Sequence, residues 1–468
     1  MASFPTMFDR LPSTADFRAL LTLALPVIVV QVGLMTMGVV DTVMVGHLSP
    51  EALAAVAIGN LYYFGCSIFG MGALMALDPV IAHAAGAGDQ ESVSRGIQRG
   101  IVLAVLLLVP TSLLLWPAAD VLGLLAQPAD ITPLAGAYAR MCIPGNLGIF
   151  LFTVFRQSLQ ALHRVRPILI TIVVANLANI LLNWMFIFGR LGAPELGVVG
   201  AALATTICRT LMAVLLLGLA WPLLGHHLHP FRRASFALAP LGRLLRIGAP
   251  IGIQHQLEYG VFAIVGLLMG SLGTIQVAGH QVALNLASIT FMVPLGLSAA
   301  AAVVVGHAVG RGDPAAAANA SRAALVVAIG FMGAMAAVFL LLPGPLARLY
   351  TTSPEVLAVA VTLIPLAGVF QVFDGIQVTS IGLLRGLGDT RTPMLTGILG
   401  FWLIGLPVSL WLGLSRGYGP VGLWWGLVLG LVVVAAFLLF RLRHRLRQPL
   451  ARLHLDAEPV PVLELPEG

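Results

Sequence analysis

Long apolar stretches separated by short polar segments run along the whole chain, and this pattern limits the folds that it can adopt. About twelve stretches contain the ~20 apolar residues that a helix needs to cross a bilayer. They lie near residues 19–45, 53–82, 97–117, 134–155, 168–188, 197–224, 247–271, 275–305, 323–349, 356–382, 393–413 and 418–440. We predict an all-α integral membrane protein with about twelve transmembrane helices.

Charged residues are scarce enough to exclude an ordinary soluble domain. Hydrophobic residues make up 59% of the chain and charged residues 9%, whereas soluble domains carry about 25% charged residues. Most of the chain must therefore face lipid or other helices. The first stretch is too long for a cleavable signal peptide and contains Asp41, so we expect it to remain in the mature protein.

The positions of the basic residues predict the orientation in the membrane. All 25 basic residues are arginine, and most fall in loops on the side that also holds both termini. Since basic loops stay in the cytoplasm, we predict that both termini are cytoplasmic. The net charge of +6 is spread over short loops and not gathered on one face, which argues against nucleic-acid binding.

An internal repeat relates the two halves of the chain. Without a gap it aligns Pro26 with Pro250, His83 with His307, and the loop HAAGAGD with HAVGRGD. Each half carries six stretches, so both halves insert with the same orientation and form two pseudo-symmetric six-helix lobes. Such lobes enclose a central cavity and rock against each other to give alternating access.

These observations predict a simple domain organisation. Two lobes are joined by a basic linker and followed by a tail rich in proline and acidic residues, which we expect to have little order and to be dispensable. The predicted parts are an N-terminal cytoplasmic segment 1–18, an N-lobe 19–224, a linker 225–246, a C-lobe 247–440 and a cytoplasmic tail 441–468.

Three carboxylates lie inside the apolar stretches, namely Asp41, Glu258 and Asp374. An ionisable residue at that depth is expensive and marks a functional site by default. Two carboxylates brought together in a dry site either share a proton or hold a cation between them, and oxygen ligands suit hard cations. We predict an ion-coupled transporter, the alternatives being structural ion pairs or misplaced helix ends.

Other polar residues recur at helical spacing in the same stretches. They could line the site or merely form hydrogen bonds between helices. We expect Asp78, before Pro79, to cap a helix or pair with an arginine, and Pro26 to kink the first helix, either as a hinge or passively. The supporting polar candidates are Asn179, Asn183, Gln371, Gln281, Asn285 and Tyr259.

Several separated segments closely resemble the multidrug and toxic compound extrusion (MATE) family, in its bacterial, NorM-like branch. They are MGVVDTVMVGHLSPEALAAVAI, VAGHQVALNLASITFMVPLGLSAAAAVVVGHAVGRGD and FDGIQVTSIGLLRGLGDTRTP, in the family's order. The resemblance implies that Glu258 and Asp374 bind the coupling cation and that Asp41 is a first-lobe coupling acid. It also implies polar roles for Asn179 and Asn183.

The function implied is export of lipophilic, often cationic drugs in exchange for Na⁺ or H⁺. No cofactor is expected beyond that ion, and Glu258 and Asp374 are its possible Na⁺ ligands. We expect the protein to work in the bilayer as a monomer. The alternative is a flippase for lipids or lipid-linked oligosaccharides, which would need basic residues in its cavity, where only Arg140 and Arg209 are candidates. We find no enzyme motif and no nucleotide-binding loop.

Overall fold

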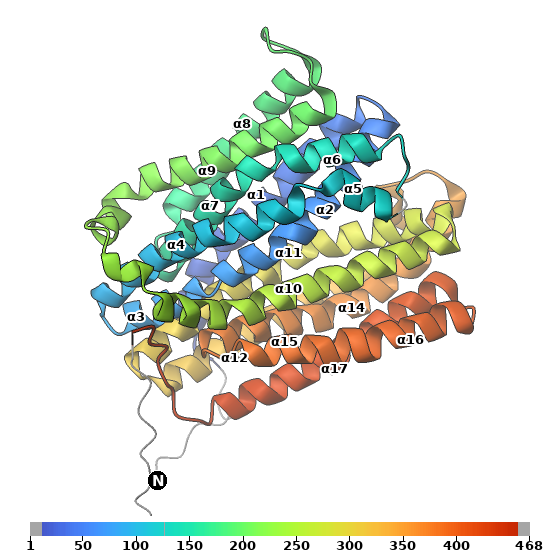
Figure 1. The fold of residues 1–468 in the computed structure, drawn as a ribbon. Coiled ribbons are helices and arrows are strands. Elements are labelled where there is room, and N and C mark those ends of the chain that lie inside the picture. The colour runs from blue at the N-terminus through green and yellow to red at the C-terminus, as the bar shows by residue number, and fades with distance from the viewer. Residues whose placement is uncertain (1–11, 126, 457–468) are drawn as a thin grey trace, which may run out of the picture.

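The computed structural model describes residues 12–125 and 127–456, and every regular element in these ranges is helical (Figure 1). Two helical bundles lie side by side. The N-lobe contains α1 Thr14–Gly46, α2 Pro50–Leu74, α3 Leu77–Gly86, α4 Gln90–Leu115, α5 Ala118–Leu124, α6 Thr132–Met141, α7 Ile143–Ala161, α8 Arg166–Phe188 and α9 Gly197–Leu228.

A 3₁₀ turn, Arg233–Phe236, leads from the N-lobe into the C-lobe. The C-lobe contains α10 Leu238–Leu272, α11 Thr274–Arg311, α12 Pro314–Leu341, α13 Pro343–Arg348, α14 Pro354–Gly386, α15 Arg391–Gly397, a π-helical segment Ile398–Gly405, α16 Leu406–Leu410, a second π-helical segment Trp411–Ser415 and α17 Gly419–Arg445. The segment 225–246, predicted as a linker, is therefore largely helical.

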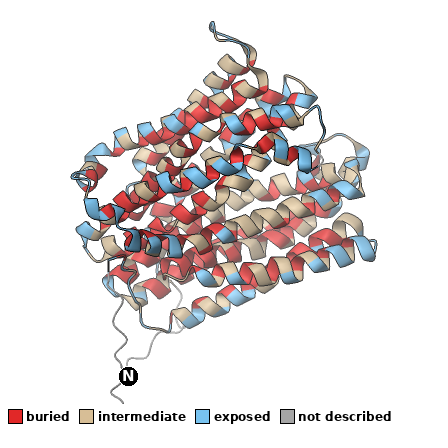
Figure 2. Ribbon diagram, viewed as in Figure 1, coloured by how far each residue is buried: buried red, intermediate tan, exposed pale blue. Residues whose placement is uncertain are grey.

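Eleven helical segments of the described chain are long and apolar enough to cross a membrane, and the bent pair α6–α7 raises this to twelve. The protein is a multi-pass membrane protein, as the sequence predicts. Exposed residues lie along the outer faces of the helices (Figure 2). Many of them are large apolar residues that lipid would cover. The 46° bend between α6 and α7 precedes Pro144, whose missing N–H cannot continue the α6 hydrogen bonds.

Capping residues explain why some helices begin before the predicted apolar stretches. Ser13 forms a capping box with Asp16 at the start of α1. In the two repeat loops, Asp89 accepts a hydrogen bond from the backbone N–H of Ser92 at 2.9 Å, and Asp313 accepts one from Ala316 at 2.9 Å. The apolar pattern marks the part of each helix that faces lipid, whereas these polar caps set where the helix starts.

The two repeat loops also bring the lobes into close contact. A Cβ atom added to Gly86 would lie 2.8 Å from the Cα of His307, and one added to Gly310 would lie 2.9 Å from the Cα of Gly86. Only glycine allows the α3 and α11 backbones to approach this closely. Elsewhere the lobe interface is formed by α2 against α10 and by α1 against α11.

The first half of α1 packs with the C-lobe, although the chain pattern assigns it to the N-lobe. Leu20, Leu23 and Val27 belong to the hydrophobic core of the C-lobe, whereas Val30 and Met37 belong to that of the N-lobe. Pro26 lies inside α1 where the helix passes from one core to the other. A bend at this proline would move the two halves of α1 with different lobes.

Residues 441–456 of the predicted tail have defined structure, in contrast to the expectation of little order. Helix α17 continues to Arg445, and residues 449–456, which we call the C-terminal strap, run across to the N-lobe. Asp456 pairs with Arg99 at 2.5 Å and Arg95 at 3.1 Å. The backbone N–H of Leu453 donates to His83 at 3.1 Å. Residues 457–468 lie outside the described chain.

Candidate functional site

A cavity of about 520 Å³ opens in the C-lobe between α10, α11 and α14. Glu258 and Asp374 both line it, from α10 and α14, and both side chains are partly exposed to it. Its remaining polar lining comes from the same two helices and from Ser288 on α11, and its walls are aromatic and aliphatic. These walls include Phe262, Phe291, Phe370 and Phe401.

Glu258 is held in the cavity by two amide side chains. Its Oε1 atom accepts a hydrogen bond from Gln377 at 2.6 Å and a longer one from Gln254, one turn earlier on α10, at 3.3 Å. His255 Nδ1 lies 3.8 Å from the other carboxylate oxygen. These contacts hold one side of the carboxylate in place, and its other side remains open toward the cavity.

Asp374 has no hydrogen-bond partner among the described residues, although its carboxylate lines the same cavity. The buried Oε1 atom of Gln377 also has no hydrogen-bond partner in this part of the chain. The cavity thus offers two carboxylates and an unpaired amide oxygen, and hard cations such as Na⁺ prefer oxygen ligands of this kind. Protonation of either carboxylate would remove one of the two negative charges from the same site.

Asp41 lies in a separate, closed cluster within the N-lobe. Its Oδ1 atom accepts hydrogen bonds from Asn183 at 2.5 Å and Asn179 at 2.9 Å, and its Oδ2 atom accepts one from Thr205 at 3.0 Å. The partners come from α8 and α9, and all four residues are buried. Thr205 is a partner that the sequence analysis missed, although it ends the conspicuous apolar segment GVVGAALAT.

The Asp41 cluster contains further polar atoms without partners. The side-chain oxygens of Asn179 and Asn183 are buried and have no hydrogen-bond partner in the described ranges. Rotation of these amides would turn their oxygens toward the carboxylate. With Asp41 and Thr205 they would then form an oxygen-rich set that suits a hard cation. The described residues contain no group of three His, Cys, Asp or Glu side chains that could hold a metal.

The structure does not bring every predicted polar residue to the cavity. Gln371 accepts a hydrogen bond from Thr290 at 2.7 Å, and Gln281 donates to Asn285 at 3.2 Å on an exposed face of α11. The candidates Gln371, Gln281 and Asn285 do not line the C-lobe cavity. Tyr259 does line it, and its hydroxyl donates to the carbonyl of Leu61 in the N-lobe at 2.8 Å.

A buried ion pair connects the cavity to the opposite lobe. Arg385 on α14 lines the cavity, and its guanidinium lies 3.6 Å from the Asp78 carboxylate on α3. Gln157 donates a further hydrogen bond to Asp78 at 3.0 Å. The expected pairing of Asp78 with an arginine is confirmed. The sequence analysis did not identify Arg385 as that partner or as a residue of the cavity.

A family model described as MatE matches residues 26–185 and 250–411 of this chain. The chain is 37% identical over 453 residues to a probable multidrug resistance protein NorM of Mesorhizobium japonicum, with 93% of this chain and 96% of the relative covered. It is also 37% identical over 441 residues to a protein of the same name from Rhizobium meliloti, with 92% and 94% covered.

Solved structures have the same fold. The eukaryotic MATE transporter AtDTX14 matches with a TM-score of 0.84 and 25% identity, with 92% of this chain and 98% of that chain covered. A mutant of the Vibrio cholerae MATE transporter VcmN matches with a TM-score of 0.83 and 21% identity, with 93% and 98% covered. The two segments that the family model matches begin at Pro26 and Pro250, which the internal repeat aligns.

Proposed function

Because this chain belongs to the MatE family, we propose that it is a secondary transporter that exports lipophilic, often cationic drugs in exchange for Na⁺ or H⁺. The multidrug resistance proteins to which it is 37% identical support drugs as the substrate class. We also propose that the protein works as a monomer in a bacterial inner membrane. Both termini would lie in the cytoplasm, because most of the arginines lie in loops on the same side as the termini.

The C-lobe cavity is the observation on which this proposal rests. Its aromatic walls suit flat apolar groups, and its two carboxylates attract positive charge. A lipophilic cation and a coupling ion both neutralise these carboxylates, so occupancy by one disfavours the other. Competition for Glu258 and Asp374 would then link drug release to ion entry, which is the requirement for antiport.

The Asp41 cluster would supply a second coupling site in the N-lobe. Its carboxylate is enclosed by three donors, so a proton or cation can reach it only when α1 moves relative to α8 and α9. Since α1 also packs on the C-lobe and contains Pro26, ion binding at Asp41 would bias the arrangement of the two lobes.

A phosphate-bearing substrate, as in the flippase alternative, has less support from the cavity. Arg385 is its only arginine among the described residues, and that guanidinium already faces Asp78. Arg209, one of the two basic candidates for a flippase, stacks on the Tyr63 ring at 4.1 Å inside the N-lobe. The site therefore favours a cationic substrate.

Transport by the purified protein in liposomes tests the proposal. A fluorescent lipophilic cation is loaded, and its movement under an imposed Na⁺ gradient is compared with its movement under an imposed pH gradient. We expect one of the gradients to drive the cation, which would identify the coupling ion. Movement under neither gradient, by protein shown to be folded, would overturn the proposal and favour the flippase.

A further inference from the structure

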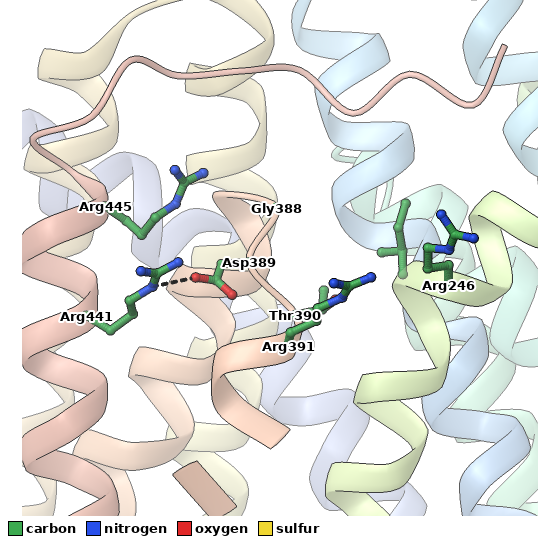
Figure 3. A pocket seen from close by; sticks show the side chains of 8 residues that line it. Arg246, Gly388, Asp389, Thr390, Arg391, Arg441 and Arg445 are labelled. Atoms are coloured by element: carbon green, nitrogen blue, oxygen red, sulfur yellow. Dashed lines mark hydrogen bonds and ion pairs between the residues drawn. The ribbon is translucent and has the colours of Figure 1, made fainter. Parts of the chain in front are cut away.

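A second cavity, of about 300 Å³, lies at the end of the C-lobe where the loop after α14 meets α10 and α17 (Figure 3). We call it the arginine pocket. Four arginines and one carboxylate line it. Its lining residues are Arg246, Ile247, Gly388, Asp389, Thr390, Arg391, Arg441 and Arg445.

Among the described residues a single carboxylate lines the arginine pocket, and it is fully engaged. Asp389 accepts a hydrogen bond from Arg441 at 2.7 Å, and it also caps α15 through the backbone N–H of Thr392 at 3.1 Å. Arg445 donates to Gln448 at 2.7 Å and to the Leu387 carbonyl at 3.3 Å, neither of which carries a charge. Within the described part of the chain, one negative charge therefore faces four positive ones.

Two of the four guanidinium groups have no partner in the part of the chain that the structure describes. Arg246 on α10 and Arg391 on α15 form no hydrogen bond or ion pair with any described residue, and the buried Nε of Arg445 is also without one. Basic residues that only set membrane orientation can point into water separately. Here arginines from three helices line one cavity, which raises the local potential. Guanidinium groups also bind phosphate through paired hydrogen bonds.

Exposed apolar side chains continue from the arginine pocket toward the membrane interior. Leu395 lies one turn after Arg391 and is 58% exposed, and Phe437 lies one turn before Arg441 and is 49% exposed. Ile253, two turns after Arg246, is 38% exposed. Because α10 and α15 begin at this end of the lobe and α17 finishes at it, all three residues lie deeper than their arginines.

We propose that the arginine pocket binds the phosphate of an anionic phospholipid, whose acyl chains lie along the exposed apolar side chains of α10, α15 and α17. Basic pockets between transmembrane helices, at headgroup depth, have the charge and shape for such a headgroup. The apolar surface directly below the arginines favours a lipid over a soluble phosphate, which would use the pocket alone.

Native mass spectrometry of the purified protein, titrated with phosphatidylglycerol or phosphatidylethanolamine, tests the proposal. The variant Arg246→Gln/Arg391→Gln removes the two unpartnered arginines of the pocket. Its matched control, Arg233→Gln/Arg447→Gln, removes the same charge from exposed positions at the same end of the bundle. We expect phosphatidylglycerol to bind the pocket variant about tenfold more weakly than the wild type and to bind the control nearly as the wild type does.

Three results would overturn the lipid proposal. Equal phosphatidylglycerol binding by the pocket variant and the control would show that only overall charge matters. Equal binding of both lipids by the wild type would remove the requirement for an anionic headgroup. Saturation of the pocket by millimolar inorganic phosphate, with loss of the lipid preference, would assign it to a soluble anion. A helical circular dichroism spectrum matching the wild type checks that the pocket variant folds.

Discussion

The carboxylates of the two lobes lie in opposite environments, although the lobes descend from one repeated unit. Asp41 in the N-lobe accepts three hydrogen bonds in a buried cluster. Glu258 and Asp374 in the C-lobe face an open cavity, and Asp374 has no hydrogen-bond partner among the described residues. If both sites bind the coupling ion as proposed, the C-lobe site would exchange it directly, whereas the N-lobe site would first have to rearrange.

Physical chemistry explains why these environments imply different kinetics. A buried carboxylate with three donors is well compensated for its lost hydration, so opening the cluster costs several hydrogen bonds at once. A carboxylate that lines a cavity keeps part of its hydration and gives it up only when a cation or proton arrives. Substitutions in the C-lobe should therefore mainly change transport, and those in the N-lobe should also change stability.

The largest expected effect is the loss of coupled export on neutralising the C-lobe pair. In Glu258→Gln or Asp374→Asn the cavity keeps its shape but loses a charge that both the ion and the cationic drug would use. We expect gradient-driven export in liposomes to fall to the level of protein-free liposomes, with normal membrane insertion. Wild-type transport by both purified variants would remove the coupling site from the C-lobe.

The next largest effect is expected on breaking the ion pair that joins the C-lobe cavity to the N-lobe. Asp78→Asn leaves the buried Arg385 guanidinium without its carboxylate. Breaking one partner of a buried ion pair costs about 3–5 kcal/mol, so thermal unfolding should begin at a clearly lower temperature. Glu91→Gln, which breaks exposed ion pairs with Arg95 and Arg232, is the control and should change little. Equal melting of both variants would contradict the role assigned to Asp78.

A smaller effect is expected on removing a single hydrogen bond from the Asp41 cluster. Thr205→Val removes one of the three donors to Asp41 at nearly constant volume. Loss of a hydrogen bond to a buried charged group costs about 1.5–3 kcal/mol, which should appear as a lower unfolding temperature and slower transport. Gln254→Leu, which removes the longer of the two hydrogen bonds to Glu258, should lower the unfolding temperature and the transport rate by less. A larger effect of Gln254→Leu than of Thr205→Val would mean that the N-lobe site is not the more tightly closed one.

The smallest effect concerns the C-terminal strap, which connects the lobes outside both sites. Partial burial raises the pKa of Asp456, but hydrogen bonds from Arg99 and Arg95 outweigh it and hold the pKa below its usual value. The contribution of this carboxylate to docking is therefore present above about pH 4, the range of a free aspartate, and is lost as the pH falls further.

Asp456→Asn should accordingly expose residues 449–456 to faster amide hydrogen exchange at neutral pH, with little change in transport. The same measurement at a pH below 4 should reduce the difference between this variant and the wild type. Unchanged exchange at neutral pH would show that Leu453 and Leu455, through their backbone contacts with His83 and Arg243, hold the strap without the carboxylate.

The lengths of the apolar stretches predicted the membrane spans, because they depend on nearby sequence. The helix starts at the two repeat loops were predicted too late in the chain, because polar caps at Asp89 and Asp313 set them. Asn179 and Asn183 were named as candidates because they share a face of one helix. Thr205, Arg385 and the strap were missed, since their partners are distant in the chain. Gln281 and Asn285 fit the same helical spacing yet lie outside the cavity, because spacing alone does not say which face a helix turns inward.

The glycines of the repeat loops have a mechanical consequence. At Gly86 and Gly310 the lobes touch backbone to backbone near one end of the bundle, so this contact could serve as a fulcrum. A helix as long as α1, with 33 residues, extends about 50 Å. A turn of about 10° around the fulcrum would then separate the far ends of the lobes by roughly 9 Å over that length. A large side chain at either glycine would push the two backbones apart at this contact and reduce the separation of the far ends.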